Sequence, residues 1–221
     1  MISDPEKWII DTNVVVHWLM AKKIMQFAIE QFHLTSEFLD VYQNRYQHSI
    51  SFVDKALGIP KSEHDFVIVE LSLNEIFSGV RDEVRSILLF VKGIPISRWA
   101  SKRETQEVSF SEELSKNVYE LTSRGFDALF GSDKIGIIPA TSPSDVETYL
   151  EVYAPLVFLH PDLKTQDAIL VTTGIFEKTN YFVTTDSTLM GLGKEKEFRQ
   201  EYSMEMVSPQ KASHILTRRR R

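Results

Sequence analysis

Two apolar runs that each end in an aspartate constrain the fold of this chain more than any other feature. Residues 8–10 lead directly into Asp11, and residues 181–183 lead through two threonines into Asp186. Short apolar runs of this kind are typical of buried strands, whose carboxyl ends share the edge of an open α/β sheet where ligands bind. Two carboxylates at that edge repel each other unless a cation neutralises them. The pair therefore favours a divalent metal site.

Further apolar runs alternate with segments of helical periodicity. Strands are predicted at about 7–11, 66–69, 135–139, 181–186 and 204–207. Helices are predicted around 19–29, 36–57, 72–78, 80–91, 109–129, 146–153 and 165–176, with Ser36, Ser109 and Ser144 as N-terminal capping residues and Gly93 as a stop. This alternation predicts an α/β fold with three layers (α/β/α), in which right-handed crossovers cover a central, mostly parallel sheet.

The composition limits the class of protein. Of the 221 residues, 43% are hydrophobic, which is enough for a packed core. We expect one domain over residues 1–212, with helical insertions at about 21–60 and 80–132, and a basic C-terminal tail at 213–221. The absence of cysteine excludes disulfides and thiolate zinc sites and is typical of a cytoplasmic protein. Because the start of the chain is acidic and its apolar stretch is interrupted, neither a signal peptide nor a membrane span is expected.

Two further acids occupy positions comparable to those of Asp11 and Asp186. Glu75 lies in the helix that follows the second predicted strand, and Asp167 lies in the first turn of a later helix. Crossover connections would bring all four acids to one side of the sheet. Carboxylate oxygens are the ligands that Mg²⁺ and Mn²⁺ prefer, so either ion is the expected cofactor. Glu70 competes with Glu75 for the second position.

Polar neighbours of the acids have a supporting role. Asn13, Thr184 and Thr185 add amide and hydroxyl oxygens of the kind that surround a magnesium site. Asn13 and Thr185 are the residues we expect beside the ligands, although both would also satisfy backbone groups at the strand ends.

Four sequence motifs occur in an order that resembles the PIN-domain family of metal-dependent ribonucleases. The first is Ile-Ile-Asp11-Thr-Asn, an opening strand with its acid and a following hydroxyl or amide. The second places a helical Glu after a serine and before a small residue, and the third is an Asp-Ala step that opens a helix. In the fourth, a threonine precedes the last aspartate. The motifs lie at residues 9–13, 72–79, 165–170 and 182–189.

The resemblance implies a function and a set of catalytic residues. It implies Mg²⁺- or Mn²⁺-dependent hydrolysis of RNA phosphodiester bonds, with Asp11, Glu75, Asp167 and Asp186 as catalytic and metal-binding residues. It also implies a homo-oligomer, and a toxin role with an antitoxin-like inhibitor as an alternative. The insertions are longer than the corresponding connections of small family members, so substrate access does not transfer from the family.

Other interpretations remain open. A non-catalytic module that binds RNA or protein through the same fold is the main alternative, because losing one acid would weaken metal binding. An aspartyl-nucleophile phosphatase is disfavoured by Asn13, where such enzymes need a second aspartate. Arg98, Lys102 and Arg103, which surround Trp99, are candidate RNA contacts despite the net charge of −6, although a solvated loop explains them equally well.

Overall fold

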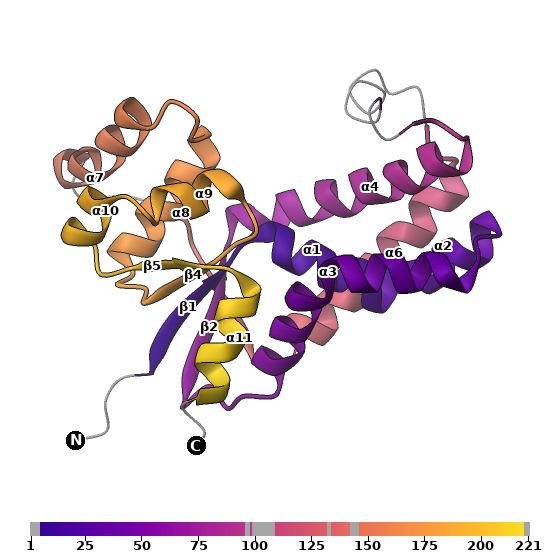
Figure 1. The fold of residues 1–221 in the computed structure, drawn as a ribbon, viewed down its shortest axis with the longest axis horizontal. Coiled ribbons are helices and arrows are strands. Elements are labelled where there is room, and N and C mark those ends of the chain that lie inside the picture. The colour runs from indigo at the N-terminus through magenta and orange to yellow at the C-terminus, as the bar shows by residue number, and fades with distance from the viewer. Residues whose placement is uncertain (1–4, 96–97, 99–108, 132–133, 142–145, 219–221) are drawn as a thin grey trace.

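A parallel β-sheet of five strands forms the centre of the molecule (Figure 1). The computed structural model describes residues 5–95, 98, 109–131, 134–141 and 146–218. The strands are β1 (Glu6–Ile10), β2 (His64–Val69), β3 (Ile135–Ile138), β4 (Tyr181–Val183) and β5 (Glu205–Val207), in the spatial order β3-β2-β1-β4-β5. Every neighbouring pair is parallel, with Trp8 opposite both Phe66 and Tyr181. The α/β class with a central parallel sheet is therefore confirmed.

The two faces of the sheet contribute to two separate hydrophobic clusters. Successive strand residues point to opposite faces, so Trp8 and Ile10 belong to one cluster and Ile9 to the other. In β2 the same alternation sends Phe66 and Ile68 to the first cluster. Burial on both faces explains why these strands read as continuous apolar runs.

The first face is covered by helices that continue far beyond the sheet (Figure 1). Helix α1 runs through a π-helical segment, η1, into α2, so that residues 12–32 form one nearly continuous rod. We call α2, α3, α4 and α6 the helical projection. The bounds on this face are α1 (Thr12–Leu19), η1 (Met20–Ile24), α2 (Met25–Phe32), α3 (Ser36–Leu57), α4 (Leu71–Val91), α6 (Glu112–Phe130) and α11 (Pro209–Arg218).

The second face is covered by four helices that lie close to the sheet. They are α7 (Val146–Leu159), α8 (Thr165–Phe176), α9 (Ser187–Leu192) and α10 (Lys196–Glu201). Helix α8 spans the predicted residues 165–176. Together with the first face, these helices complete the three-layer α/β/α arrangement. None of the helices in the described ranges is both long and apolar enough to cross a membrane.

Several predicted boundaries were wrong. The hydroxyl of Ser111, rather than that of Ser109, accepts a hydrogen bond from the backbone N–H of Leu114 and caps α6. Thr35 precedes α3, so Ser36 is its first helical residue. The two helices predicted at 72–78 and 80–91 are the single helix α4, because Gly79 is accommodated within it. Ser144 lies outside the described residues.

The C-terminal segment is helical rather than a tail. Helix α11 packs against α3, and it buries Ala212, Ser213 and Leu216. The predicted tail at 213–221 therefore begins inside a packed helix that extends to Arg218. Residues 219–221 lie outside the described part of the chain.

Candidate functional site

The four predicted acids line one pocket at the carboxyl edge of the sheet. This pocket, which we call the acidic pocket, has a volume of about 480 Å³. Each acid lies just before or near the start of a different helix: α1, α4, α8 or α9. The parallel topology brings these helix starts together, as the sequence predicts. The lining residues are Asp11, Thr12, Asn13, Asn74, Glu75, Ser78, Gly79, Lys164, Gln166, Asp167 and Asp186.

Asp11 is the most deeply buried of the four acids. It follows β1, and its backbone N–H donates to the carbonyl of Val183 at 2.9 Å, which joins the ends of β1 and β4. The residue is only 5% exposed. The hydroxyl of Thr184, itself fully buried, donates to Asp11 Oδ2 at 2.6 Å.

The environment of Asp11 disfavours its ionised form. Burial raises the pKa of the Asp11 carboxyl to about 7, and the nearby carboxylates of Asp167 and Glu75 add to the increase. The hydrogen bond from Thr184 acts in the opposite direction, since it stabilises the carboxylate. A cation in the pocket would offset the repulsion between Asp11 and the carboxylates of Asp167 and Glu75.

Glu75 is brought to the pocket by close packing of α4 on α1. A Cβ atom at Gly79 would lie 2.8 Å from Val16 Cγ2, so glycine lets the two helices approach. The hydroxyl of Thr12 then donates to Glu75 Oε2 at 2.7 Å. Glu70 is exposed at the beginning of the same helix and does not line the pocket. Of the two candidates for the second acid, Glu75 is the one that faces the other three.

Asp167 and Asp186 complete the cluster. Burial raises the pKa of Asp167, and the carboxylates of Asp186 and Glu75 raise it further, whereas the Lys164 ammonium lowers it. Asp186 has a structural role as well, because its Oδ1 accepts from the backbone N–H groups of Thr188 at 2.7 Å and Leu189 at 3.1 Å. This is an N-cap of α9. Asp186 therefore both caps α9 and lines the acidic pocket.

The donor chemistry of the pocket fits Mg²⁺ or Mn²⁺, because carboxylate, hydroxyl and amide oxygens line it. In the described parts of the chain, however, no three Asp, Glu or His side chains are grouped closely enough to hold a metal ion as they stand. Asp11, Glu75 and Asp186 each have an oxygen engaged by a hydrogen bond. A cation that keeps several waters and takes only one or two carboxylates directly suits acids spaced in this way.

The supporting residues differ in part from the prediction. Asn13 lines the acidic pocket, but the Thr185 side chain is exposed and lines a neighbouring pocket. Thr184 is the residue that contacts an acid. The register at the end of β4 decides this, since successive residues of an extended chain point in opposite directions.

Of the three predicted basic contacts, the one in the described part of the chain, Arg98, does not line the acidic pocket. Arg98 lies beyond the C-terminal end of α4, whereas Glu75 is near its N-terminal end. The rise of α4 between Glu75 and Val91 alone is about 24 Å. Lys102 and Arg103 lie outside the described residues.

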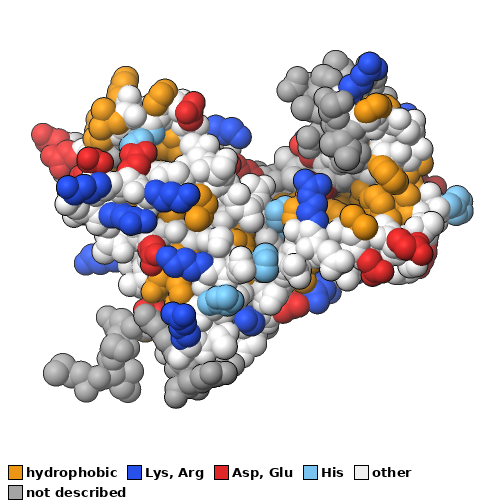
Figure 2. Space-filling view, viewed as in Figure 1, with side chains coloured by type: hydrophobic (Ala, Val, Ile, Leu, Met, Phe, Trp, Pro, Cys, Tyr) orange, Lys and Arg blue, Asp and Glu red, His pale blue; other side chains and the backbone are white. Residues whose placement is uncertain are grey.

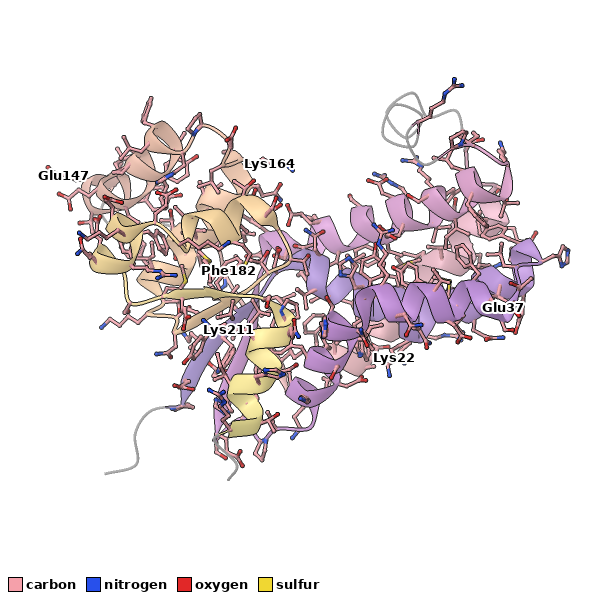
Figure 3. The ribbon with its side chains drawn as sticks, in the orientation of Figure 1. Lys22, Glu37, Glu147, Lys164, Phe182 and Lys211 are labelled. Carbon is pink, nitrogen blue, oxygen red and sulfur yellow. The ribbon has the colours of Figure 1, made fainter. Side chains whose placement is uncertain are left out.

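The sequence analysis assigned no role to several residues that line the acidic pocket, and two of them bear on its chemistry. Lys164 is the cationic residue among the described residues that line it, and Figure 3 labels it just before α8. Its place directly before α8, three residues before Asp167, is the signal that would have found it. Thr12, which bridges to Glu75, was noted only as part of a motif.

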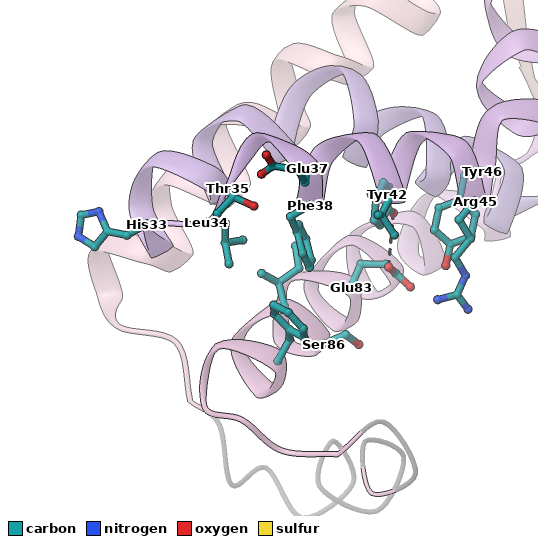
Figure 4. A pocket seen from close by; sticks show the side chains of 13 residues that line it. His33, Leu34, Thr35, Glu37, Phe38, Tyr42, Arg45, Tyr46, Glu83 and Ser86 are labelled. Carbon is teal, nitrogen blue, oxygen red and sulfur yellow. Dashed lines mark hydrogen bonds between the residues drawn. The ribbon is translucent and has the colours of Figure 1, made fainter.

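Two further cavities lie beside or beyond the acidic pocket. The first, which we call the strand-end pocket, has a volume of about 420 Å³ and is lined by residues of α1, α3, α9, α11 and the ends of β4 and β5. The second, the α3–α4 groove, has a volume of about 540 Å³ and lies within the helical projection (Figure 4). Arg45 and Tyr46 line both cavities. Figure 2 shows hydrophobic side chains gathered over the projection.

Comparison with known proteins adds no assignment. No family model, no curated protein sequence and no solved structure matches the chain.

Proposed function

We propose that the protein is a metal-dependent ribonuclease whose reaction takes place in the acidic pocket. The observation that carries the proposal is that four carboxylates from four separate helix starts line one pocket. Such a cluster does not stabilise the fold. Burial and mutual repulsion disfavour the ionised forms of Asp11 and Asp167, and their pKa values are raised for this reason. Clusters of this kind are typical of sites that gain a cation and a phosphate together.

Each residue of the acidic pocket would have its own role in the reaction. A bound Mg²⁺ or Mn²⁺ would supply positive charge that acidifies the attacking water and stabilises the leaving oxygen. Asp11, Asp167 and Asp186 would bind the metal ion. Glu75 would accept the proton of the water, and the Lys164 ammonium would bind a phosphate oxygen, a contact that carboxylates alone cannot provide.

The direct test is cleavage of single-stranded RNA with Mg²⁺ or Mn²⁺ and with chelator. Asp11→Asn should reduce the rate by more than about 100-fold, because even residues that only support metal ligands cost 10–100-fold. Glu70→Gln is the matched control, since Glu70 is an exposed acid that does not line the pocket. Cleavage by Asp11→Asn at the parent rate would rule out the proposed site.

A non-catalytic binding module is the second candidate. It is favoured by the spacing of the acids, because no three in the described ranges are gathered for a metal as they stand. Calorimetric titration with Mn²⁺ separates the two functions. The nuclease should bind the ion in a way that Asp11→Asn weakens, whereas a binding module should give no heat that depends on Asp11.

A further inference from the structure

The strand-end pocket adjoins the acidic pocket across one short segment. Residues 184–186 follow β4: Thr184 donates to Asp11, the side chain of Thr185 lines the strand-end pocket, and Asp186 lines the acidic pocket. Helix α1 links the same two pockets, since Thr12 lines the acidic pocket and His17 the strand-end pocket. Five residues of helix rise by only about 7.5 Å. The two pockets are therefore about one nucleotide apart.

The charges of the two pockets are opposite. Four acids line the acidic pocket, whereas none of the described residues lining the strand-end pocket is acidic. Arg45 and His48 are exposed at the strand-end pocket, on the same helix. Histidine side chains are visible at the surface between the projection and the strand ends (Figure 2). A polyanion whose scissile phosphate lies among the acids would find its adjoining nucleotide in a neutral to positive site.

Aromatic rings and apolar side chains form much of the lining of the strand-end pocket. The rings of His17 and Tyr46 stack with centroids 3.8 Å apart, and the Arg45 guanidinium lies over the Tyr46 ring at 5.2 Å (Arg45 and Tyr46 are labelled in Figure 4). Met190 and Pro209 add apolar surface. Gln210 is exposed at the start of α11 and offers an amide donor and acceptor. Apolar walls with a few convergent polar groups are typical of small-ligand pockets.

We infer that the strand-end pocket binds the base of the nucleotide next to the scissile phosphate. This inference rests on the proposed function of the acidic pocket. A base in a duplex is stacked and paired, so only an unpaired base can enter a cavity of this kind. Gln210 reads the edge of the base through its amide, and Arg45 contacts the backbone at the mouth of the pocket.

The test measures binding of fluorescein-labelled oligouridine, oligocytidine and oligoadenosine by fluorescence anisotropy in the presence of Mn²⁺. All variants carry Asp11→Asn, so that the RNA is not cleaved during the measurement. Adding Arg45→Ala should weaken binding of all three by about tenfold, since a hydrogen bond to a charged group contributes about that much. Adding Gln210→Ala should make the three dissociation constants more alike. Arg124→Ala and Gln200→Ala, exposed residues of α6 and α10, are the matched controls and should change nothing. Circular dichroism checks that each variant is folded.

The same substitutions in the active parent distinguish failure of this inference from failure of the proposed function. If the parent cleaves RNA and Gln210→Ala keeps its KM and base preference, the strand-end pocket is not a base site, while the nuclease stands. If the parent cleaves no RNA but the pocket variants still weaken binding, the nuclease proposal fails and the pocket remains a nucleotide site. Equal binding by Arg45→Ala, Gln210→Ala and the control variants overturns the inference.

Discussion

The acidic pocket and the α3–α4 groove lie on the same scaffold but are built in different ways. The pocket collects charged side chains at the end of the sheet, where burial and repulsion oppose ionisation of Asp11. The groove collects apolar side chains on two long helices, and Phe90 is 47% exposed there. Charged side chains thus gather at the carboxyl edge of the sheet, whereas the α3–α4 groove exposes apolar side chains where the helices extend away from the sheet. We therefore expect substitutions in the acidic pocket to change the free energy of unfolding more than substitutions of exposed residues in the groove.

The largest expected effect is a gain of stability on removing a charge from the pocket. Asp11 has a pKa of about 7 when folded, against 3.8 in the unfolded chain, so the folded state binds more protons between these values and loses stability as pH rises through them. At about pH 8 with chelator, Asp11→Asn should raise the free energy of unfolding by up to about 4 kcal/mol, with little gain near pH 4. Urea unfolding at several pH values measures this.

The control for that experiment lies in the helical projection. Asp40 is exposed on α3, so Asp40→Asn should change the free energy of unfolding by less than about 0.5 kcal/mol at any pH. Similar gains in the free energy of unfolding for the two variants would contradict this account, and so would a gain for Asp11→Asn that does not depend on pH. Either result would mean that ionised Asp11 does not destabilise the folded state.

A smaller loss is expected from Thr184→Val. The Thr184 hydroxyl donates to Asp11 Oδ2 and also accepts from the backbone N–H of Asp186 at 2.9 Å. Losing a hydrogen bond to a charged group should cost about 2 kcal/mol near pH 8. Thr172→Val is the matched control, since the buried Thr172 hydroxyl has no hydrogen-bond partner within the described residues and its loss should cost almost nothing. Equal unfolding midpoints for the two variants would contradict this account.

The contrast between the two regions also explains what the sequence can predict. Asp11, Glu75, Asp167 and Asp186 are marked by local patterns, namely strand ends and helix starts, and the parallel topology then fixes where they meet. The choice of Thr184 over Thr185 depends on one residue of register, which an apolar run followed by two threonines does not define. The α3–α4 groove depends on how two inserted helices pack, so no short motif predicts it. The cap of α6 was misplaced because Ser109 and Ser111 both precede acidic residues.

Gly79→Ala tests how the pocket is joined to the projection. The added methyl group would meet Val16, whose branched side chain cannot easily move, and would push α4 away from α1. The free energy of unfolding should fall by about 1–2 kcal/mol, since overpacking exceeds the gain in helix propensity. Gly191→Ala on α9, where an added Cβ has no neighbour within 4 Å, should instead raise it by about 0.5–1 kcal/mol. Two gains would show that α1 and α4 have room to separate.

The smallest effect is expected in the groove itself. Val41 is 67% exposed on α3 and lines the groove, whereas Val53 on the same helix is fully buried. Val41→Ser should therefore change the free energy of unfolding by less than about 0.5 kcal/mol, and Val53→Ser should lower it by at least about 1.5 kcal/mol. Urea unfolding at two protein concentrations is the measurement. A large loss for Val41→Ser that grows with concentration would mean that another copy of the chain covers the groove, because an apolar side chain open to water has almost no burial energy to lose.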